Sequence, residues 1–367
     1  MRSNYKQLGQ YIRQVDVRNV DGKEENLLGV SVQKQFIPSI ANTVGTDFSK
    51  YKVVKKGQFT YIPDTSRRGD KIGIALLEDY EEGLVSNVYT VFEVIDENQL
   101  MPEYLMLWFT RPEFDRYARF KSHGSVREVM DWDEMCKVEL PVPPIEKQRS
   151  IVKAYQAITN RIALKRKMNE NLEATAQVIY KKLFIESIDI ANLPEGWHLY
   201  NLGDVAVLNA GGDKPAVFSD LQTESCSIPI YSNGIVDEGL YGFTDKAKVF
   251  EESVTVSARG TVGHVFLREE PYVPIVRLIS VVPNQEYVTA KYLYFALSSI
   301  DLQSTGTSQQ QITVPDFKKR KLVVPCNSVM VDFMSKIEPL FAFIKRNKAE
   351  IKILSALQNN FLTVLSH

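Results

Sequence analysis

The chain has 367 residues, enough for two or three domains of ordinary size. Hydrophobic residues make up 44% of it and charged residues 24%, which excludes a disordered chain, and the net charge of −1 argues, on composition alone, against a nucleic-acid-binding protein. Three scattered cysteines and four histidines without ligand spacing argue against a disulfide framework and predict that the chain holds no metal.

The first predicted element is a strand-rich globular domain at 1–140. The chain starts MRSNYKQLGQ, without the apolar region of a secretory signal, and its apolar runs YLMLWF and YLYFAL are far shorter than the roughly 18 residues of a membrane span. We therefore expect a cytoplasmic protein that does not enter a membrane. Short apolar runs then alternate with turn residues up to the proline-rich stop LPVPP at 140–144, as expected for strands joined by tight turns.

The second predicted element is a long helix at 141–190, free of proline and glycine after its start. Its apolar residues follow a heptad repeat over more than four heptads, which predicts a coiled coil. A core helix of the first domain is the alternative, but about 40 residues far exceeds the usual length of a globular helix. The predicted seam consists of Tyr155, Ile162, Asn169, Ala176 and Leu183 at one position, and Ile151, Ile158, Lys165, Leu172 and Ile179 at the other.

The third and fourth elements repeat this plan. Pro194 and Gly196 end the first helix, a second strand-rich domain follows at 191–325, and a second long helix is predicted at 326–367. The polar seam residues of both helices are expected to fix register and partner choice at a cost in stability. The second seam consists of Ile337, Ile344, Ile351, Gln358 and Leu365 at one position, and Phe333, Leu340, Asn347, Leu354 and Phe361 at the other.

The two halves are an internal duplication. The segments that begin at Gly124 and Gly306 align at a constant offset of 182 positions to the C-terminus, so that Leu140 falls on Leu322. Further upstream the match is looser, with LGQYI at 8–12 facing LGDVA at 202–206. Each half also contains a basic stretch with a local charge of +6, at 137–182 and at 318–352. Isolated basic runs are often a solvated helix face, but here both halves have one.

Four segments resemble one known family, the type I restriction–modification specificity subunits. LPVPPIEKQRSIV at 140–152 resembles the signature that opens their central helix, and LPEGWHLYNLGDV at 193–205 resembles the usual start of their target recognition domains. VSARGTVGHV at 256–265 and GTSQQQI at 306–312 also resemble segments of those domains. The resemblance covers essentially the whole chain in the family's order. The first half lacks the Pro-x-Gly-Trp opening, and the second signature, CNSVMVDFM, lacks the Glu-Gln pair.

The resemblance implies an α+β fold in which two strand-rich α/β target recognition domains are separated by two long helices that form an antiparallel coiled coil with pseudo-twofold symmetry. It implies that each domain reads one part of a split target in double-stranded DNA. It further implies that methyltransferase subunits and restriction/translocase subunits assemble around this frame. The chain would then be the non-catalytic recognition subunit of an adenine methyltransferase/endonuclease complex.

Candidate DNA contacts in the first domain lie in two loops. TSRRGDKIG at 65–73 places Arg67, Arg68 and Lys71 around a glycine, where they can meet phosphates or guanine edges. Ser125 and Arg127 begin the segment that repeats in the second half. An ordinary basic turn and a polar surface loop are the alternatives for these two segments.

Candidate contacts in the second domain occupy related positions. Arg259 and Thr261 lie beside Gly260 in SARGTVG, and Gln309 and Gln311 belong to GTSQQQI, in which Gln309 matches Arg127. Glutamine can pair with adenine and arginine with guanine, so a difference at matched positions is what two domains with different targets require. Tyr231 and Asn233 in IPIYSNG are further candidates. Ordinary surface loops are again the alternative.

The motifs of catalysis are missing from the sequence. VPPI at 142–145 has neither the polar first residue nor the aromatic last residue of an adenine methyltransferase motif, and no Gly-x-x-x-x-Gly-Lys loop is present for ATP. We therefore expect no catalytic residues and no cofactor. Two other readings stay open: a stand-alone restriction or modification enzyme, which AdoMet crosslinking would reveal, and a coiled-coil adaptor that does not bind DNA, which a salt-dependent duplex-binding experiment would separate.

Overall fold

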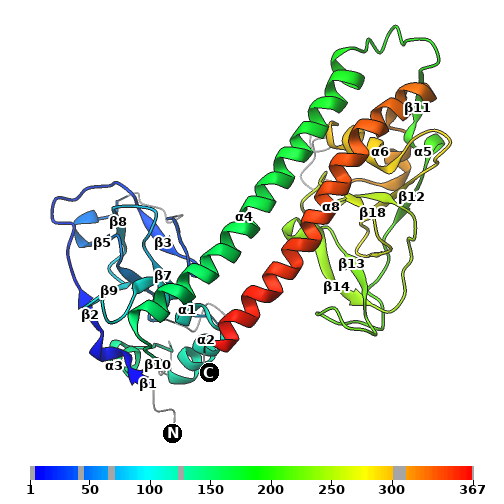
Figure 1. Ribbon diagram of the computed structural model, residues 1–367. Coiled ribbons are helices and arrows are strands. Elements are labelled where there is room, and N and C mark those ends of the chain that lie inside the picture. The colour runs from blue at the N-terminus through cyan, green and yellow to red at the C-terminus, as the bar shows by residue number, and fades with distance from the viewer. Residues whose placement is uncertain (1–4, 40–44, 65–70, 123–127, 301–310, 366–367) are drawn as a thin grey trace. The chain divides into compact units, whose positions relative to one another are not determined.

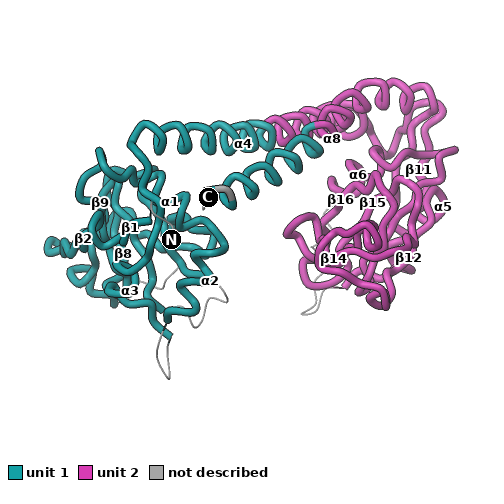
Figure 2. The backbone as a smooth tube through the Cα atoms, turned by 60° about the horizontal axis from the view of Figure 1, so that its bottom comes forward, with its two compact units in different colours: residues 1–167, 347–367 teal, residues 168–346 magenta. Residues whose placement is uncertain are grey.

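The computed structural model describes residues 5–39, 45–64, 71–122, 128–300 and 311–365 (Figure 1). Packing divides the chain into two compact units: unit 1 contains residues 1–167 and 347–367, and unit 2 contains residues 168–346 (Figure 2). In the parts of the chain that the structure describes, no helix has both the length and the apolar character needed to cross a membrane.

Unit 1 begins with short strands and ends with helices. Its helical elements before the long helix are the 3-10 turns η1 (Leu8–Gln10) and η2 (Phe48–Lys50) and the helices α1 (Pro102–Thr110), α2 (Pro112–Lys121) and α3 (Trp132–Cys136). Its strands are β1 (Tyr5–Gln7), β2 (Ile12–Val15), β3 (Leu28–Val30), β4 (Phe36–Pro38), β5 (Lys52–Lys55), β6 (Phe59–Tyr61), β7 (Ile74–Leu76), β8 (Glu82–Val85), β9 (Thr90–Val94) and β10 (Glu139–Pro141).

An antiparallel sheet in the order β2-β9-β6-β7 carries the core of unit 1. Phe59 and Phe92 stack on neighbouring strands with ring centroids 4.8 Å apart, and Phe109 of α1 stands edge-on to both. Pro102 begins α1, where its fixed φ favours a first helical turn. The two-stranded sheets β5-β8 and β3-β4 enclose a smaller apolar cluster around Val54 and Val85.

Unit 2 has the same arrangement. Its large sheet runs β12-β18-β15-β16, which is the order of the unit 1 sheet, and α6 packs against it. A second sheet of three strands has the order β14-β13-β17, and its strands fall between β12 and β18 in the sequence. Its helical elements are α5 (Leu202–Val205), η4 (Val236–Gly239), α6 (Ala290–Ser298) and α7 (Val314–Lys318). Its strands are β11 (His198–Asn201), β12 (Ala206–Ala210), β13 (Ile228–Tyr231), β14 (Leu240–Thr244), β15 (Ser253–Val256), β16 (Val265–Arg268), β17 (Val273–Pro274), β18 (Ile279–Pro283) and β19 (Lys321–Val324).

Equivalent hydrogen bonds confirm the duplication. The amide of Leu8 donates to the carbonyl of Val138 at 2.8 Å, and the amide of Leu202 donates to the carbonyl of Arg320 at the same distance. The hydroxyl of Tyr104 donates to the Pro141 carbonyl at 3.0 Å. Its counterparts in unit 2, Tyr292 and Val323, form the same bond. The offset of 182 positions also relates α3 to α7 and β10 to β19.

Two long helices follow the two domains: α4 (Ile145–Lys181), continued by a π-helical turn at Lys182–Glu186, and α8 (Asn327–Val364). None of the twenty predicted seam residues is exposed, so the heptad prediction is confirmed. The helices run antiparallel within each unit. In unit 1 the ring of Tyr155 lies 6.0 Å from that of Phe361, and in unit 2 the ring of Tyr180 lies 6.1 Å from that of Phe333.

Polar residues of the seam bond to the opposite helix. The Lys165 ammonium donates to the Asn347 side chain at 2.9 Å and lies 2.7 Å from the Glu350 carboxylate, which also accepts a bond from Arg161. These bonds lower the pKa of Glu350, chiefly through the hydrogen bond from Lys165. Lys165 and Asn347 are equivalent positions of the repeat, so two matched positions with different side chains contact each other.

The end of each long helix completes a core that the other half of the sequence begins. Ala176, Tyr180 and Phe184, from the end of the first helix, are buried in the core of unit 2 beside Tyr292. Leu362, near the end of α8, is buried in the core of unit 1. Each unit therefore contains the start of its own helix and the end of the other.

Gln148 shows how the two halves diverge. Its side chain is fully buried, accepts from the Met101 amide at 2.9 Å, and donates to the carbonyls of Gln99 and Pro143, both at 2.8 Å. It thereby satisfies the backbone at the start of α1, whose N-cap, Met101, has no side-chain acceptor. In unit 2 the matched residue is the buried Met330. There Thr289 caps α6 with its own hydroxyl, which explains why the second signature lacks the glutamine.

Gln148→Met, which copies the matched residue, is predicted to lower the free energy of unfolding by about 2–4 kcal/mol because it leaves buried backbone groups without partners. Urea denaturation followed by near-ultraviolet circular dichroism measures the change. Met330→Leu is the control and should cost less than about 1.5 kcal/mol, since it keeps volume and polarity. Equal losses in the two variants would contradict the role of the Gln148 hydrogen bonds.

Candidate nucleic-acid interface

The same end of the large sheet gathers the candidate loops in each unit. In unit 2, Val256 pairs with both Val265 and Ile279, so the loop at 257–264 and the turn at 275–278 leave the sheet side by side. In unit 1, Tyr61 pairs with Ile74 and Thr90, which places the two described ends of the next loop, 62–64 and 71–73, beside the turn at 86–89. We call this end of the sheet, with its loops, the recognition edge of that unit.

Asn233 links the loops of the unit 2 recognition edge. Its side-chain oxygen accepts from the Ala258 amide at 2.8 Å, and its side-chain nitrogen donates to the Val276 carbonyl at 2.7 Å. Its own carbonyl accepts from the Thr261 hydroxyl at 2.5 Å. One side chain that follows β13 therefore holds the Arg259 loop and the 275–278 turn together.

Arg259 and Gln311 lie at the exposed surface of this edge. The guanidinium of Arg259 donates to the side-chain oxygen of Gln311 at 3.1 Å, and both side chains are exposed. The backbone fixes their segments, because the Ile312 amide donates to the Ala258 carbonyl at 3.1 Å. Guanidinium and amide groups present donors and an acceptor in fixed directions, which is the chemistry that discriminates base edges.

The corresponding segments of unit 1 pair in the same way. The Met130 amide donates to the Pro63 carbonyl at 2.9 Å, and Asp64 forms a bridge with Val129. Met130 matches Ile312 in the repeat. In both units the described residues that follow the GS or GT segment thus lie against the loop that carries the candidate arginines.

Tyr231 and Arg268 support the unit 2 edge from inside. The Arg268 guanidinium lies 3.6 Å from the centre of the Tyr231 ring and donates to the Thr255 hydroxyl at 2.9 Å and to the Glu238 carbonyl at 2.6 Å. Burial raises the pKa of the Tyr231 phenol. Burial also lowers the pKa of Arg268. Arg268 covers one face of the Tyr231 ring and holds the η4 segment through the Glu238 carbonyl.

A buried ion pair anchors the base of the basic loop in unit 1. The Lys34 ammonium lies 2.7 Å from the Asp115 carboxylate and donates to the Phe109 carbonyl at 2.6 Å. Burial lowers the pKa of Lys34. Asp115 also accepts from the Ile72 amide at 3.2 Å, so α2 fixes the chain directly after Lys71, which is exposed.

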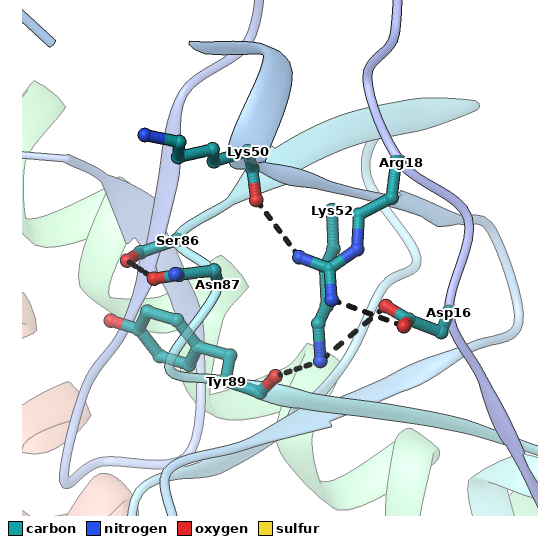
Figure 3. Close-up of polar contacts among 7 residues, drawn as sticks. All are labelled: Asp16, Arg18, Lys50, Lys52, Ser86, Asn87 and Tyr89. Carbon is teal, nitrogen blue, oxygen red and sulfur yellow. Dashed lines mark hydrogen bonds and ion pairs between the residues drawn. The ribbon is translucent and has the colours of Figure 1, made fainter. Parts of the chain in front are cut away.

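A basic cluster at the unit 1 edge was not foreseen from the sequence. Figure 3 shows Arg18 donating to the Lys50 carbonyl at 3.0 Å and to Asp16 at 3.1 Å. Lys52 lies 3.7 Å from Asp16 and donates to the Tyr89 carbonyl at 2.9 Å. The cations come from two segments 32 residues apart, one with Arg18 and one with Lys50 and Lys52, and only the fold brings them together. Asp16 and Asp47 pair with these three cations, so the cluster has a net charge of +1, the sign that phosphate contacts require.

Of the candidate contacts predicted from sequence, the structure brings five together at the unit 2 edge and describes Lys71 at the unit 1 edge. Arg67, Arg68, Ser125, Arg127 and Gln309 lie outside the described residues. In the described part of the chain, no group of three or more His, Cys, Asp or Glu side chains could hold a metal ion. The five residues at the unit 2 edge are Tyr231, Asn233, Arg259, Thr261 and Gln311.

Relatives of the chain are type I specificity subunits. A putative type I specificity subunit of Mycoplasma pneumoniae is 36% identical over 157 residues, 42% of this chain and 47% of that protein. The specificity subunit of a type I restriction enzyme of Methanocaldococcus jannaschii is 23% identical over 303 residues, 74% of this chain and 70% of that protein. The chain thus spans about half the length of the first of these relatives.

A solved structure has the same fold. The S subunit of a type I restriction-modification system from M. genitalium superposes with a TM-score of 0.60 at 14% identity, over 99% of this chain and 96% of that chain. Residues 9–174 and 194–353 each match the type I restriction modification DNA specificity domain. The two matches cover most of the sequence and coincide with the two halves of the duplication. The chain therefore belongs to the type I restriction modification DNA specificity family and carries two copies of its domain.

Proposed function

We propose that the chain is the DNA sequence-specificity subunit of a type I restriction–modification complex and reads a bipartite target in double-stranded DNA. The observation that carries this proposal is the pair of recognition edges on one repeated fold. The same sheet end, in the same strand order, presents Arg259 and Gln311 in one unit and a different basic surface in the other. Two edges of one architecture with different side chains suit two different half-sites.

The target recognition domains of this proposal are residues 1–140 and 191–325, and the spacer helices are 141–190 and 326–367. A helix of 37 residues, such as α4, is about 55 Å long at 1.5 Å per residue. Helices of this length would hold the half-sites apart, with unspecified bases between them. The proposed DNA-contacting residues are Arg67, Arg68, Lys71, Ser125 and Arg127 for one half-site, and Tyr231, Asn233, Arg259, Thr261, Gln309 and Gln311 for the other.

The proposal assigns the chemistry to partner subunits. The chain would scaffold adenine methyltransferase subunits and restriction/translocase subunits, and would itself be non-catalytic, without a cofactor, in the cytoplasm where chromosomal DNA lies. Related proteins support such an assembly, since they are specificity subunits of type I restriction enzymes. The stand-alone enzyme and the non-DNA adaptor are less favoured, because neither accounts for two matched edges that differ in their side chains.

Co-expression of the chain with the products of its neighbouring genes, followed by genome-wide mapping of methylated adenines, tests the proposal. We expect one split motif with two defined parts and a fixed gap. Methylation without a common motif would contradict the proposed role, as would methylation that does not require this chain.

Affinity of the assembled complex for duplex DNA is predicted to fall steeply with salt, because phosphate contacts release counterions. Six to ten such contacts correspond to a loss of about 10³- to 10⁵-fold between 50 and 200 mM salt. Fluorescence anisotropy with a labelled duplex at increasing salt measures the slope. A flat response would show that the basic stretches at 137–182 and 318–352 do not support phosphate contacts.

Each unit is predicted to recognise the bases of one half-site only. Arg259→Ala, or Gln309→Ala combined with Gln311→Ala, should weaken recognition of one half-site by about 1–3 kcal/mol and leave the other unchanged. Methylation of duplexes with single base changes in each half-site measures both effects. Equal losses at the two half-sites would indicate that these residues serve structure or general affinity.

A fragment of residues 1–190 is predicted to form a weak dimer, and its two copies should take the place of the two halves of the full chain. The second copy must supply the helix end that α8 supplies in the native protein, so Tyr180 must fill the space of the smaller Leu362. Lys165 must also meet Lys165 of the second copy in place of Asn347, with Met168 at the position of Glu350. Lys165→Asn combined with Tyr180→Leu should therefore strengthen the dimer, which sedimentation equilibrium measures.

With methyltransferase subunits present, the fragment dimer should methylate a palindromic split site built from the first half-site and its inverted copy, since two identical domains related by a twofold axis meet equivalent bases. Methylation mapping reads the site directly. Methylation at the original asymmetric site would contradict the division of the target between the halves. A stable dimer that directs no methylation would do so as well.

A further inference from the structure

The turn between β17 and β18 has an unusual backbone for its sequence. The Leu278 amide donates to the Ile275 carbonyl at 3.0 Å, and the two residues between them, Val276 and Arg277, have φ angles of 52° and 61°. These values define a type I′ turn, which strongly favours asparagine and glycine. A β-branched valine in the left-handed region is a genuine outlier, and such a conformation persists only where surrounding groups impose it.

Three hydrogen bonds from two neighbouring segments impose the turn. The Val276 amide donates to the Gly212 carbonyl at 2.8 Å, and the Arg277 amide donates to the Gly211 carbonyl at 2.9 Å. Asn233, from the second segment, donates to the Val276 carbonyl. A Cβ atom at Gly211 would lie 2.6 Å from the backbone of Pro274, so glycine is needed for this close approach. The backbone of the turn is thus held rigidly although its own side chains do not favour it.

Core packing does not explain the strain. Val276 is 53% exposed and Arg277 is exposed, whereas the flanking Ile275 and Leu278 are each 1% exposed. The tip of the turn belongs to the unit 2 recognition edge, where Asn233 ties it to the Arg259 loop. An exposed, strained and rigidly held tip beside candidate contact residues is typical of a ligand-binding element.

Unit 1 has an equivalent turn with a different tip. The Tyr89 amide donates to the Ser86 carbonyl at 3.1 Å, and Lys52 donates to the Tyr89 carbonyl from the neighbouring sheet (Figure 3). Asn87 and Val88 occupy the tip, and neither adopts the left-handed conformation. The two recognition edges therefore differ in both the side chains and the backbone of this turn, as they do at the matched positions of Arg127 and Gln309.

We propose that the 275–278 turn is a specificity-determining element of the second half-site and that Arg277 contacts a guanine there. The inference rests on the proposed function and deepens it. An arginine can bond in a bidentate manner to the O6 and N7 atoms of guanine in the major groove, which requires the guanidinium to be presented in one direction. The rigid turn supplies that direction, because it fixes the Cα–Cβ bond of Arg277 relative to Arg259 and Gln311. The 86–89 turn is the matched element for the first half-site.

Arg277→Lys in the assembled methyltransferase complex is the decisive variant, because it keeps the charge and the backbone but removes the bidentate fork. We expect the preference for one guanine of the second half-site to fall by about 10- to 100-fold. The other positions should keep their preferences. Methylation rates on duplexes that carry each single base change measure this.

A second variant separates recognition from stability. Val276→Asn combined with Arg277→Gly installs a sequence that favours the type I′ turn, so we expect the melting temperature to rise by about 2 °C or more while the same guanine preference is lost. Asn87→Ala is the matched control and should leave the second half-site unaffected. A rise in stability together with a loss of recognition distinguishes a binding element from a structural one.

The inference is overturned if Arg277→Lys leaves every base preference intact, or if it weakens both half-sites equally. It is also overturned if the double variant becomes less stable, since the turn would then serve the fold. Failure of the proposed function gives a different result: the unchanged complex would methylate without any sequence preference.

Discussion

The exchange of helix ends is the constraint on which both units depend. Unit 2 buries Tyr180 and Phe184 from the first long helix, and unit 1 buries Leu362 from the second. Neither core is complete within its own half of the sequence. The two helices must therefore keep matched lengths and a common register, since a shift of one turn would withdraw the buried side chains at both ends. The sequence repeats a domain followed by a helix. Each packed unit instead combines one domain, the start of its own helix and the end of the helix from the other copy.

Polar residues in the seam make this exchange selective. Lys165 and Asn347 are equivalent positions that contact each other, and Glu350 neutralises the lysine. Because the contact joins unlike residues, pairing of a helix with a copy of itself would bring two lysines together. The seam gives up apolar packing at this point and gains a preference for the intended partner. Gln358 is a second polar seam residue that bonds to the opposite helix, where it donates to the Thr159 hydroxyl at 2.7 Å.

The sequence was sufficient for the repeat, the two helices and their seam, since each rests on spacing along the chain. The strand order of the sheets was beyond it, because β2 pairs with β9 across more than seventy residues. The Asn233 network joins three distant segments and leaves no local signal. Val276 and Arg277 were missed for a physical reason: turns are recognised by glycine and asparagine, and here neighbouring backbone enforces a turn that the sequence itself disfavours. Five candidate residues fall outside the described residues, so their predicted contacts stay predictions.

The placement of Leu362 also bears on how the protein is made. A ribosome adds about 5–20 residues per second, and a domain normally folds soon after it emerges. Unit 1 emerges first, yet Leu362, which belongs to its core, is translated only after the whole of unit 2. During synthesis of the second half, the pocket for Leu362 remains an apolar surface exposed to the cell and to chaperones. Unit 2, by contrast, has received Tyr180 before its own first strand leaves the ribosome, so the half that is translated second is the first to hold all its core.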